Sequence, residues 1–152
     1  MGRRFAVVSE YRNRGINLPQ RKTRWSAGYD LEAAEEVTVP AGAVALIPTG
    51  LKAYMEADEV LMLHIRSSLA VKQGLVLANG TGIIDADYVD NPDNEGHILV
   101  AVYNRSQSPV TIRKGQAVAQ GIFVKYLRTD DDTPGGERLG GFGSTNPGNR
   151  VP

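Results

Sequence analysis

Residues 43–65 read AVALIPTGLKAYMEADEVLMLHI, three short apolar runs separated by polar or Gly-containing breaks. The runs span 43–48, 51–54 and 60–65, which is the usual length of a β-strand and short for a helix. Gly and Pro at the breaks favour turns. The stretch therefore predicts consecutive strands in an all-β domain.

Runs of the same kind continue on both sides of this stretch. Pro-Ala-Gly at 40–42 and Arg-Lys-Gly at 113–115 predict tight turns between strands. Many short strands in one domain suit a sandwich, a jelly roll or a distorted barrel. The expected strands are 5–8, 37–39, 43–48, 51–54, 60–65, 75–78, 98–103, 110–112 and 117–126.

The composition indicates one domain followed by a tail. A chain of 152 residues and 16.4 kDa, with 41% apolar and 22% charged residues, is large enough for a single hydrophobic core. After residue 128 the chain carries Asp-Asp-Asp at 130–132, Pro-Gly-Gly at 134–136 and a Gly-rich end. We therefore expect a β domain over 1–128 and a flexible tail over 129–152.

Charge and cysteine content exclude several classes of function. Lys and Arg number 17 and Asp and Glu number 17, so no basic excess favours nucleic acid as a partner. The chain has no cysteine, which excludes disulfides, thiolate metal sites and a cysteine nucleophile. No apolar run approaches the roughly 20 residues that cross a bilayer, and the N-terminus lacks a signal-peptide pattern. We expect a cytoplasmic protein without a membrane partner.

Five polar, Gly-containing segments interrupt the strand pattern and are the candidates for chemistry. They are AGYDLEAA (27–34), RSSLAVKQG (66–74), NGTGIIDADY (79–88), GQAVAQGI (115–122) and GGFGST (140–145).

The segment RSSLA places a guanidinium and two hydroxyls before an expected short helix at 68–73. Ser67 or Ser68 is expected to cap the helix and Gly74 to end it. Arg66 with Ser hydroxyls and helix-start N–H groups suits a phosphate. An ordinary cap beside a solvated arginine is the alternative.

The segment NGTGIIDADY combines glycines, which allow close backbone approach to a ligand, with two carboxylates. If 83–88 is extended, Asp85 and Asp87 project from one face. Asp85 beside Ile84 is a candidate general base, and a turn with solvated carboxylates is the alternative. The Tyr88 ring suits either a ligand or the core.

Taken together and in this order, the five segments resemble the five motifs of the homotrimeric dUTP pyrophosphatases (dUTPases), over about 23–145. The resemblance implies a distorted jelly roll or β-barrel, assembled as a homotrimer with shared active sites. It also implies Mg²⁺-assisted hydrolysis of dUTP to dUMP and pyrophosphate, a reaction of nucleotide metabolism that keeps uracil out of DNA.

The resemblance also implies roles for individual residues. Asp85 matches the general base that activates the attacking water, and Asp30 matches the carboxylate that holds Mg²⁺ through water. Tyr88 matches the ring under the deoxyribose, which leaves no room for a 2′-hydroxyl. The positions matching phosphate contacts are Arg66, Ser67, Ser68, Gln120, Arg138, Ser144 and Thr145. Those matching uracil and deoxyribose contacts are Asn79, Gly82, Ile83, Ile84, Tyr88 and Phe142, whose ring closes over uracil.

The chain departs from the family pattern at four places, one of which is Asn146, where Gly often ends the last motif. Ser68 replaces the Gly of a common Arg-Ser-Gly motif. The segment VDNPDN at 89–94 lengthens the third motif before Glu-Gly. Arg138 stands one residue nearer to Phe142 than in many members.

Three other functions remain open from the sequence. The first alternative is a dCTP deaminase, a family that shares this fold and the sequence RSSLA. A deaminase needs a glutamate in the strand that matches residues 100–104, and this chain has Ala101 at that position. An alanine cannot transfer a proton, which disfavours deamination. The second alternative is a regulatory or interaction protein with this fold, for which the segment 89–94 would be the interaction surface. A broad nucleoside triphosphate pyrophosphatase is disfavoured, because a site built around particular donors rejects analogues.

Overall fold

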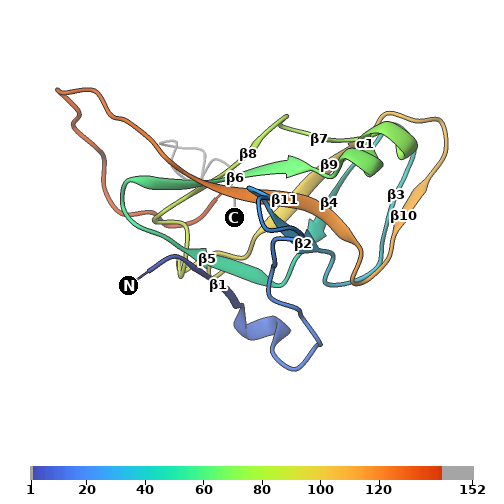
Figure 1. Cartoon of the computed structure of the whole chain (residues 1–152), viewed down its shortest axis with the longest axis horizontal. Helices are drawn as coiled ribbons and strands as arrows, with labels where there is room; N and C mark the ends of the chain where they lie inside the picture. Colours follow the sequence, from blue (N-terminus) through green and yellow to red (C-terminus); the bar gives the residue numbers. More distant parts are fainter. Residues whose placement is uncertain (1, 142–152) are drawn as a thin grey trace.

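A computed structural model describes residues 2–141, and most of them form short strands joined by turns (Figure 1). The elements in chain order are β1 (Arg4–Val7), a 3₁₀ turn η1 (Ser9–Tyr11), β2 (Tyr29–Glu32), β3 (Val37–Val39), β4 (Val44–Pro48), β5 (Leu51–Tyr54), β6 (Glu59–Ile65), α1 (Ser67–Gln73), β7 (Leu75–Leu77), β8 (Gly82–Asp85), β9 (Leu99–Asn104), β10 (Val110–Ile112) and β11 (Ala117–Lys125). Within residues 2–141, no helix has the length and apolar character needed to span a bilayer.

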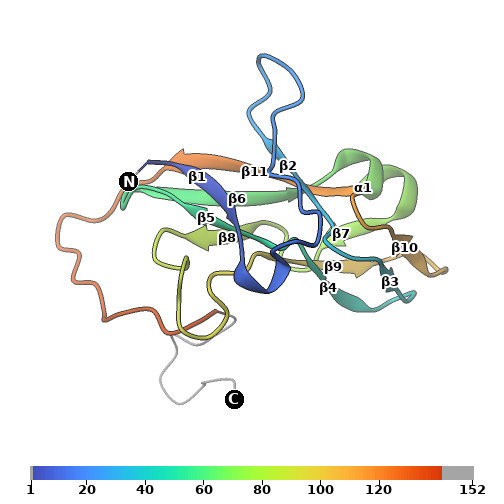
Figure 2. The ribbon, with the colours of Figure 1, turned by 90° about the horizontal axis from the view of Figure 1, so that it is seen from below.

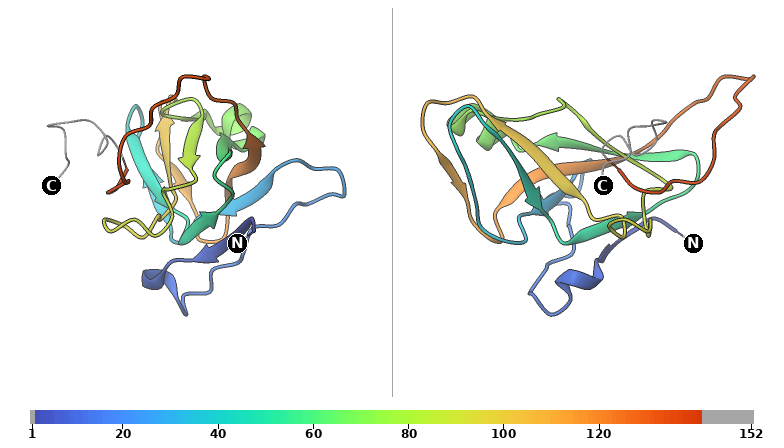
Figure 3. Two further views of the ribbon diagram at one scale, coloured as in Figure 1. Left: turned by 90° about the vertical axis from the view of Figure 1, so that its left-hand side faces the viewer. Right: turned by 180° about the vertical axis from the view of Figure 1, so that it is seen from behind.

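The strands form four antiparallel sheets around one interior. The largest has the order β2-β11-β6-β8, the next β4-β9-β7, and two strand pairs, β1-β5 and β10-β3, complete the arrangement. Viewed along the strands, the sheets surround a common interior (Figure 3, left). After β11, the segment from residue 126 to residue 141 extends away from the sheets and then returns toward β8 (Figures 1 and 2). The expectation of an all-β, jelly-roll-like fold is confirmed.

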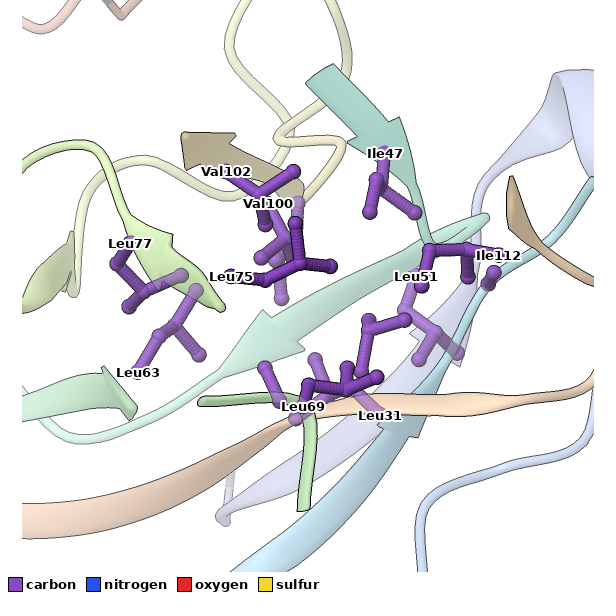
Figure 4. Close-up of a cluster of buried hydrophobic side chains, with 14 of the residues drawn as sticks. Leu31, Ile47, Leu51, Leu63, Leu69, Leu75, Leu77, Val100, Val102 and Ile112 are labelled. Atoms are coloured by element: carbon purple, nitrogen blue, oxygen red, sulfur yellow. The ribbon is translucent and has the colours of Figure 1, made fainter. Parts of the chain in front are cut away.

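The core is filled by branched aliphatic side chains that come from facing sheets (Figure 4). Leu31 and Leu61 from the largest sheet, and Leu75 and Val102 from the three-stranded sheet, have no exposed surface. Along β6 the buried residues alternate with half-buried ones, as expected for a strand with one face in the core. Each fully buried leucine contributes roughly 1.5–3 kcal/mol to the free energy of folding.

All nine expected strands are present, with ends shifted by no more than one residue. Two further strands, β2 and β8, were not expected. β2 has the sequence Tyr-Asp-Leu-Glu, which mixes acidic and apolar residues, and β8 begins with Gly82, a residue type that is disfavoured in strands. Gly82 is required there: a Cβ would lie 3.0 Å from the Leu63 Cβ on β6. Its lack of a side chain therefore lets β8 pack closely on β6.

The helix ends as expected but begins differently. Gly74 has φ of 72° and ends α1 in the left-handed conformation. Arg66 stands at the N-cap, and no side chain there makes a capping hydrogen bond. The expected Ser67 or Ser68 cap is therefore wrong, because α1 begins one residue earlier and includes both serines, leaving their side chains exposed.

Candidate active site

A cavity of about 280 Å³ lies between β8, the connection 78–81 that precedes it, and β9. Its apolar wall includes Leu63, Leu77 and Val100, and its polar rim includes Asn79 and Asp85. The complete lining is Leu63, Leu77, Asn79, Thr81, Gly82, Ile83, Ile84, Asp85, Tyr88, Leu99, Val100, Ala101, Arg138 and Gly141. The structure thus brings most of the predicted base and sugar contacts together.

Sequence reasoning missed the part of this wall that β7 and β9 supply. Leu77, Leu99 and Val100 stand in none of the five motif segments, but β7 pairs with β9, and all three residues line the cavity beside β8. Ala101, the position at which a deaminase needs a carboxylate, also lines the cavity.

Asp85 is the last residue of β8 and lies opposite Val60 of β6. Its side chain is 51% exposed, so solvent reaches the carboxylate. Arg138 donates to Asp85 Oδ2 from Nη2 at 2.5 Å and to Asp87 Oδ1 from Nε at 2.7 Å. The strand ends at Asp85 instead of extending through 88, yet the two carboxylates still converge on one guanidinium.

Tyr88 forms a buried wall of the cavity, with 7% of its surface exposed. Its hydroxyl donates to the His97 carbonyl at 2.7 Å and accepts from Asn94 Nδ2 at 2.8 Å. Burial raises the pKa of the Tyr88 phenol above its ordinary value. Because its polar atom is satisfied by protein groups, the ring presents apolar surface to a ligand.

Asp30, Arg66 and Gln120 form a second group, at the other end of the largest sheet. Gln120 on β11 lies opposite Asp30 on β2. Arg66 Nη1 donates to Asp30 Oδ1 at 2.7 Å. A Cβ on Gly28 would lie 2.4 Å from Gln120 Oε1, so the glycine leaves the space that the glutamine side chain occupies.

Asp30 is 7% exposed, and its Oδ2 is buried without a hydrogen-bond partner among residues 2–141. Over the same described range, no group of three or more His, Cys, Asp or Glu side chains is placed to hold a metal ion. Mg²⁺ is usually held by one or two carboxylates together with phosphates and water. A single carboxylate oxygen beside the phosphate candidates fits that mode of binding.

The two groups lie far apart within one chain. Asp85 faces Val60, whereas Arg66 directly follows Ile65, the last residue of β6. Six residues of strand span roughly 20 Å. One chain therefore does not bring Asp85 to the Arg66, Gln120 and Asp30 group.

Three predicted site residues, Phe142, Ser144 and Thr145, lie outside the described residues. Ser67 and Ser68 are exposed on the first turn of α1, adjacent to Arg66. Both serine side chains are therefore accessible to a ligand beside Arg66, and their contact with phosphate stays a prediction.

Comparison with solved structures defines the class of protein. The chain matches a crystal structure of dUTPase from Streptococcus mutans with a TM-score of 0.80 and 46% identity, covering 84% of this chain and 98% of that one. It also shares its fold with a dUTPase from phage phi11 of S. aureus, at a TM-score of 0.70 and 22% identity, over 95% of this chain and 99% of that one. The fold is that of dUTPases.

Sequence comparison gives the family. The dUTPase family model matches residues 14–145. A protein of Lactococcus lactis subsp. lactis (strain IL1403), named deoxyuridine 5'-triphosphate nucleotidohydrolase, is 54% identical over 145 residues, which is 94% of this chain and 97% of that protein. The chain belongs to the dUTPase family.

Proposed function

We propose that this protein hydrolyses dUTP to dUMP and pyrophosphate and so keeps uracil out of DNA. The observation that carries the proposal is Asp85, a solvent-accessible carboxylate at the rim of a pocket of nucleoside size, in a chain of the dUTPase family. Asp85 accepts a proton from a water molecule, and the resulting hydroxide attacks the α-phosphorus in line with the departing pyrophosphate.

The pocket recognises uracil and deoxyribose. Within residues 2–141, β8 is an edge strand, so backbone N–H and C=O groups along 82–84 are free on the side away from β6. Such groups complement the alternating donors and acceptors of a uracil edge, and Asn79 adds a side-chain amide. Tyr88 lies under the sugar, where its buried ring leaves no space for a 2′-hydroxyl.

The phosphates are held by Arg66, Ser67, Ser68 and Gln120, which share the charge that develops in the transition state. Asp30 Oδ2 would hold Mg²⁺ through water, and the cation would supply positive charge to the phosphates. The tail, through Arg138, Ser144 and Thr145, adds phosphate contacts, and Phe142 covers the uracil ring.

The active site is completed by other copies of the chain. Because Asp85 and Arg66 are separated by roughly 20 Å of strand within one chain, a single triphosphate cannot reach both. A homotrimer, in which Asp85 of one copy faces Arg66 of a neighbour, brings the two groups together.

The rival deaminase activity is disfavoured by Ala101, whose methyl group lines the cavity and cannot transfer a proton. The test is an assay of pyrophosphate release from dUTP, dCTP, dTTP and UTP, with and without Mg²⁺, and a mass measurement in solution. We expect Mg²⁺-dependent hydrolysis of dUTP alone, by an assembly of three 16.4 kDa chains. Ammonia release from dCTP, or no turnover of dUTP, would refute the proposal.

A further inference from the structure

The lengthened segment after β8 forms a closed hydrogen-bonded loop in which Asn91 is the central residue. Asn91 Nδ2 donates to the Tyr88 carbonyl at 2.7 Å and to Asn94 Oδ1 at 2.8 Å. Its Oδ1 accepts from the backbone N–H groups of Asp93 and Asn94, at 2.9 and 3.1 Å. Asn91 is 5% exposed, so a buried amide with all its polar atoms satisfied fixes the shape of the loop.

Asn94 connects this loop to the pocket wall. Its Oδ1 accepts from Gly96 N–H at 3.1 Å and from Asn91, and its Nδ2 donates to the Tyr88 hydroxyl. That hydroxyl in turn donates to the His97 carbonyl. The Tyr88 oxygen is therefore fixed both as donor and as acceptor, which determines where the ring lies.

The loop is itself anchored to β5. Lys52 Nζ donates to Asp90 Oδ1 at 2.6 Å and to Glu95 Oε1 at 2.8 Å, and the Tyr54 hydroxyl donates to Asp90 Oδ2 at 2.7 Å. Gly96 has φ of 82°, and a Cβ there would lie 2.6 Å from Val89 Cα. These contacts leave the loop little freedom, so Asn94 is a fixed support.

We propose that Asn94 is a positioning residue that sets the selectivity of the pocket for a deoxyribose over a ribose. It acts through Tyr88: the Asn94 amide holds the ring against the cavity, and the ring excludes the 2′-hydroxyl. This role rests on the proposed hydrolysis of dUTP, and it gives the segment 89–94 a function in substrate discrimination. Gly141 packs on the same ring, since a Cβ there would lie 3.0 Å from Tyr88 Cε1.

The test compares Asn94→Ala, Tyr88→Phe and the double variant in kcat/KM for dUTP and for UTP. Both single variants remove the same hydrogen bond, and Tyr88→Phe keeps the ring and the Asn91–Asn94 contact. We expect each to lower the dUTP-to-UTP selectivity by roughly fivefold. The double variant should lose little more than Tyr88→Phe alone, because Asn94 acts on the ring through the Tyr88 hydroxyl, which Tyr88→Phe already removes.

Asn104→Ala is the matched control, because Asn104 is a fully buried amide at the end of β9 that donates to the Val39 and Ser108 carbonyls and makes no hydrogen bond to Tyr88. It should weaken turnover of both nucleotides equally and leave their ratio unchanged. Unchanged selectivity in folded Asn94→Ala and Tyr88→Phe would overturn the proposal. An equal loss of selectivity in Asn104→Ala would overturn it too, because a general loss of rigidity in the protein would then be sufficient to explain the lower dUTP-to-UTP selectivity.

A second measurement separates this proposal from the proposed function. Ring-labelled tyrosine, with the Tyr88 signal assigned from Tyr88→Phe, reports the rate of ring flipping by NMR without any substrate. We expect slow flipping in the wild type and faster flipping in Asn94→Ala. If the wild type does not hydrolyse dUTP, this rate still decides whether Asn94 holds the ring, and an unchanged rate would refute that role.

Discussion

The separation of Asp85 from Arg66 within one chain leads to a complementation experiment. Asp85→Asn removes the proposed base, and Arg66→Ala removes a phosphate contact, so each homotrimer should be inactive. Roughly 20 Å of β6 lies between the two positions, and each site must therefore combine Asp85 of one chain with Arg66 of another. Co-expression of the two variants should restore activity that neither has alone.

The size of the restored activity follows from random assembly. A site works only if its Asp85 comes from the Arg66→Ala chain and its Arg66 from the Asp85→Asn chain. With equal amounts of both chains, each condition is met half of the time, so about one quarter of the sites should be active in a closed symmetric trimer. If both groups belonged to one chain, every site would carry one defect and none would be active.

A matched control uses the wild type co-expressed with a chain that carries both substitutions. Shared sites again give about one quarter of the wild-type rate, whereas sites contained in single chains give about one half. The assay is pyrophosphate release from dUTP by the whole population of assemblies, without selection of mixed ones, and a pull-down through two different tags verifies separately that mixed assemblies form. Absence of restored activity in assemblies that contain both chains would refute the shared site.

Further expectations concern single groups. Asp85→Asn should retain binding of a non-hydrolysable dUTP analogue by calorimetry and lose on the order of 10²–10⁴ in kcat; near-normal turnover would contradict its role as base. Gly74→Ala should lower the free energy of unfolding in urea by about 1 kcal/mol, because Gly74 has φ of 72° and alanine is strained there; an unchanged midpoint would contradict this. Burial lowers the pKa of His97, whose Nε2 accepts from Gly50 N–H at 2.9 Å. The unfolded chain then binds more protons, so the stabilisation is complete above about pH 6.5 and decreases as the pH falls below it. Urea midpoints at pH 7 and pH 5 should show this loss, and it should be smaller in His97→Gln. Deletion of residues 138–152 should reduce turnover of dUTP and leave the mass of the assembly unchanged apart from the missing residues, and full activity of the truncated protein would exclude a role for the tail.

The strands were predictable because their apolar runs are short and bounded by turn residues. The strand 37–39 and the turn that follows it appear as the sequence predicts, with Ala43 N–H donating to the Pro40 carbonyl at 3.2 Å. β2 was less predictable, since Asp30 is buried in it although aspartate is disfavoured in strands. The partner that makes this burial possible, Arg66, is distant in sequence, and only the folded sheet brings the two together.

Long-range contacts also limited how much of the candidate active site could be predicted from the sequence. Motif order made Asp85, Tyr88 and Asp30 candidates for the chemistry, because each stands in a short segment of unusual composition. The contacts that orient them are long-range or lie in the segment that departs from the family pattern, as for Asn94 on the Tyr88 hydroxyl. An asparagine in a polar loop has no sequence signature that separates a solvated amide from one that fixes a ring. The distinction depends on burial and on the geometry of two hydrogen bonds, and it decides whether a substitution at 94 changes only the loop or the choice between two sugars.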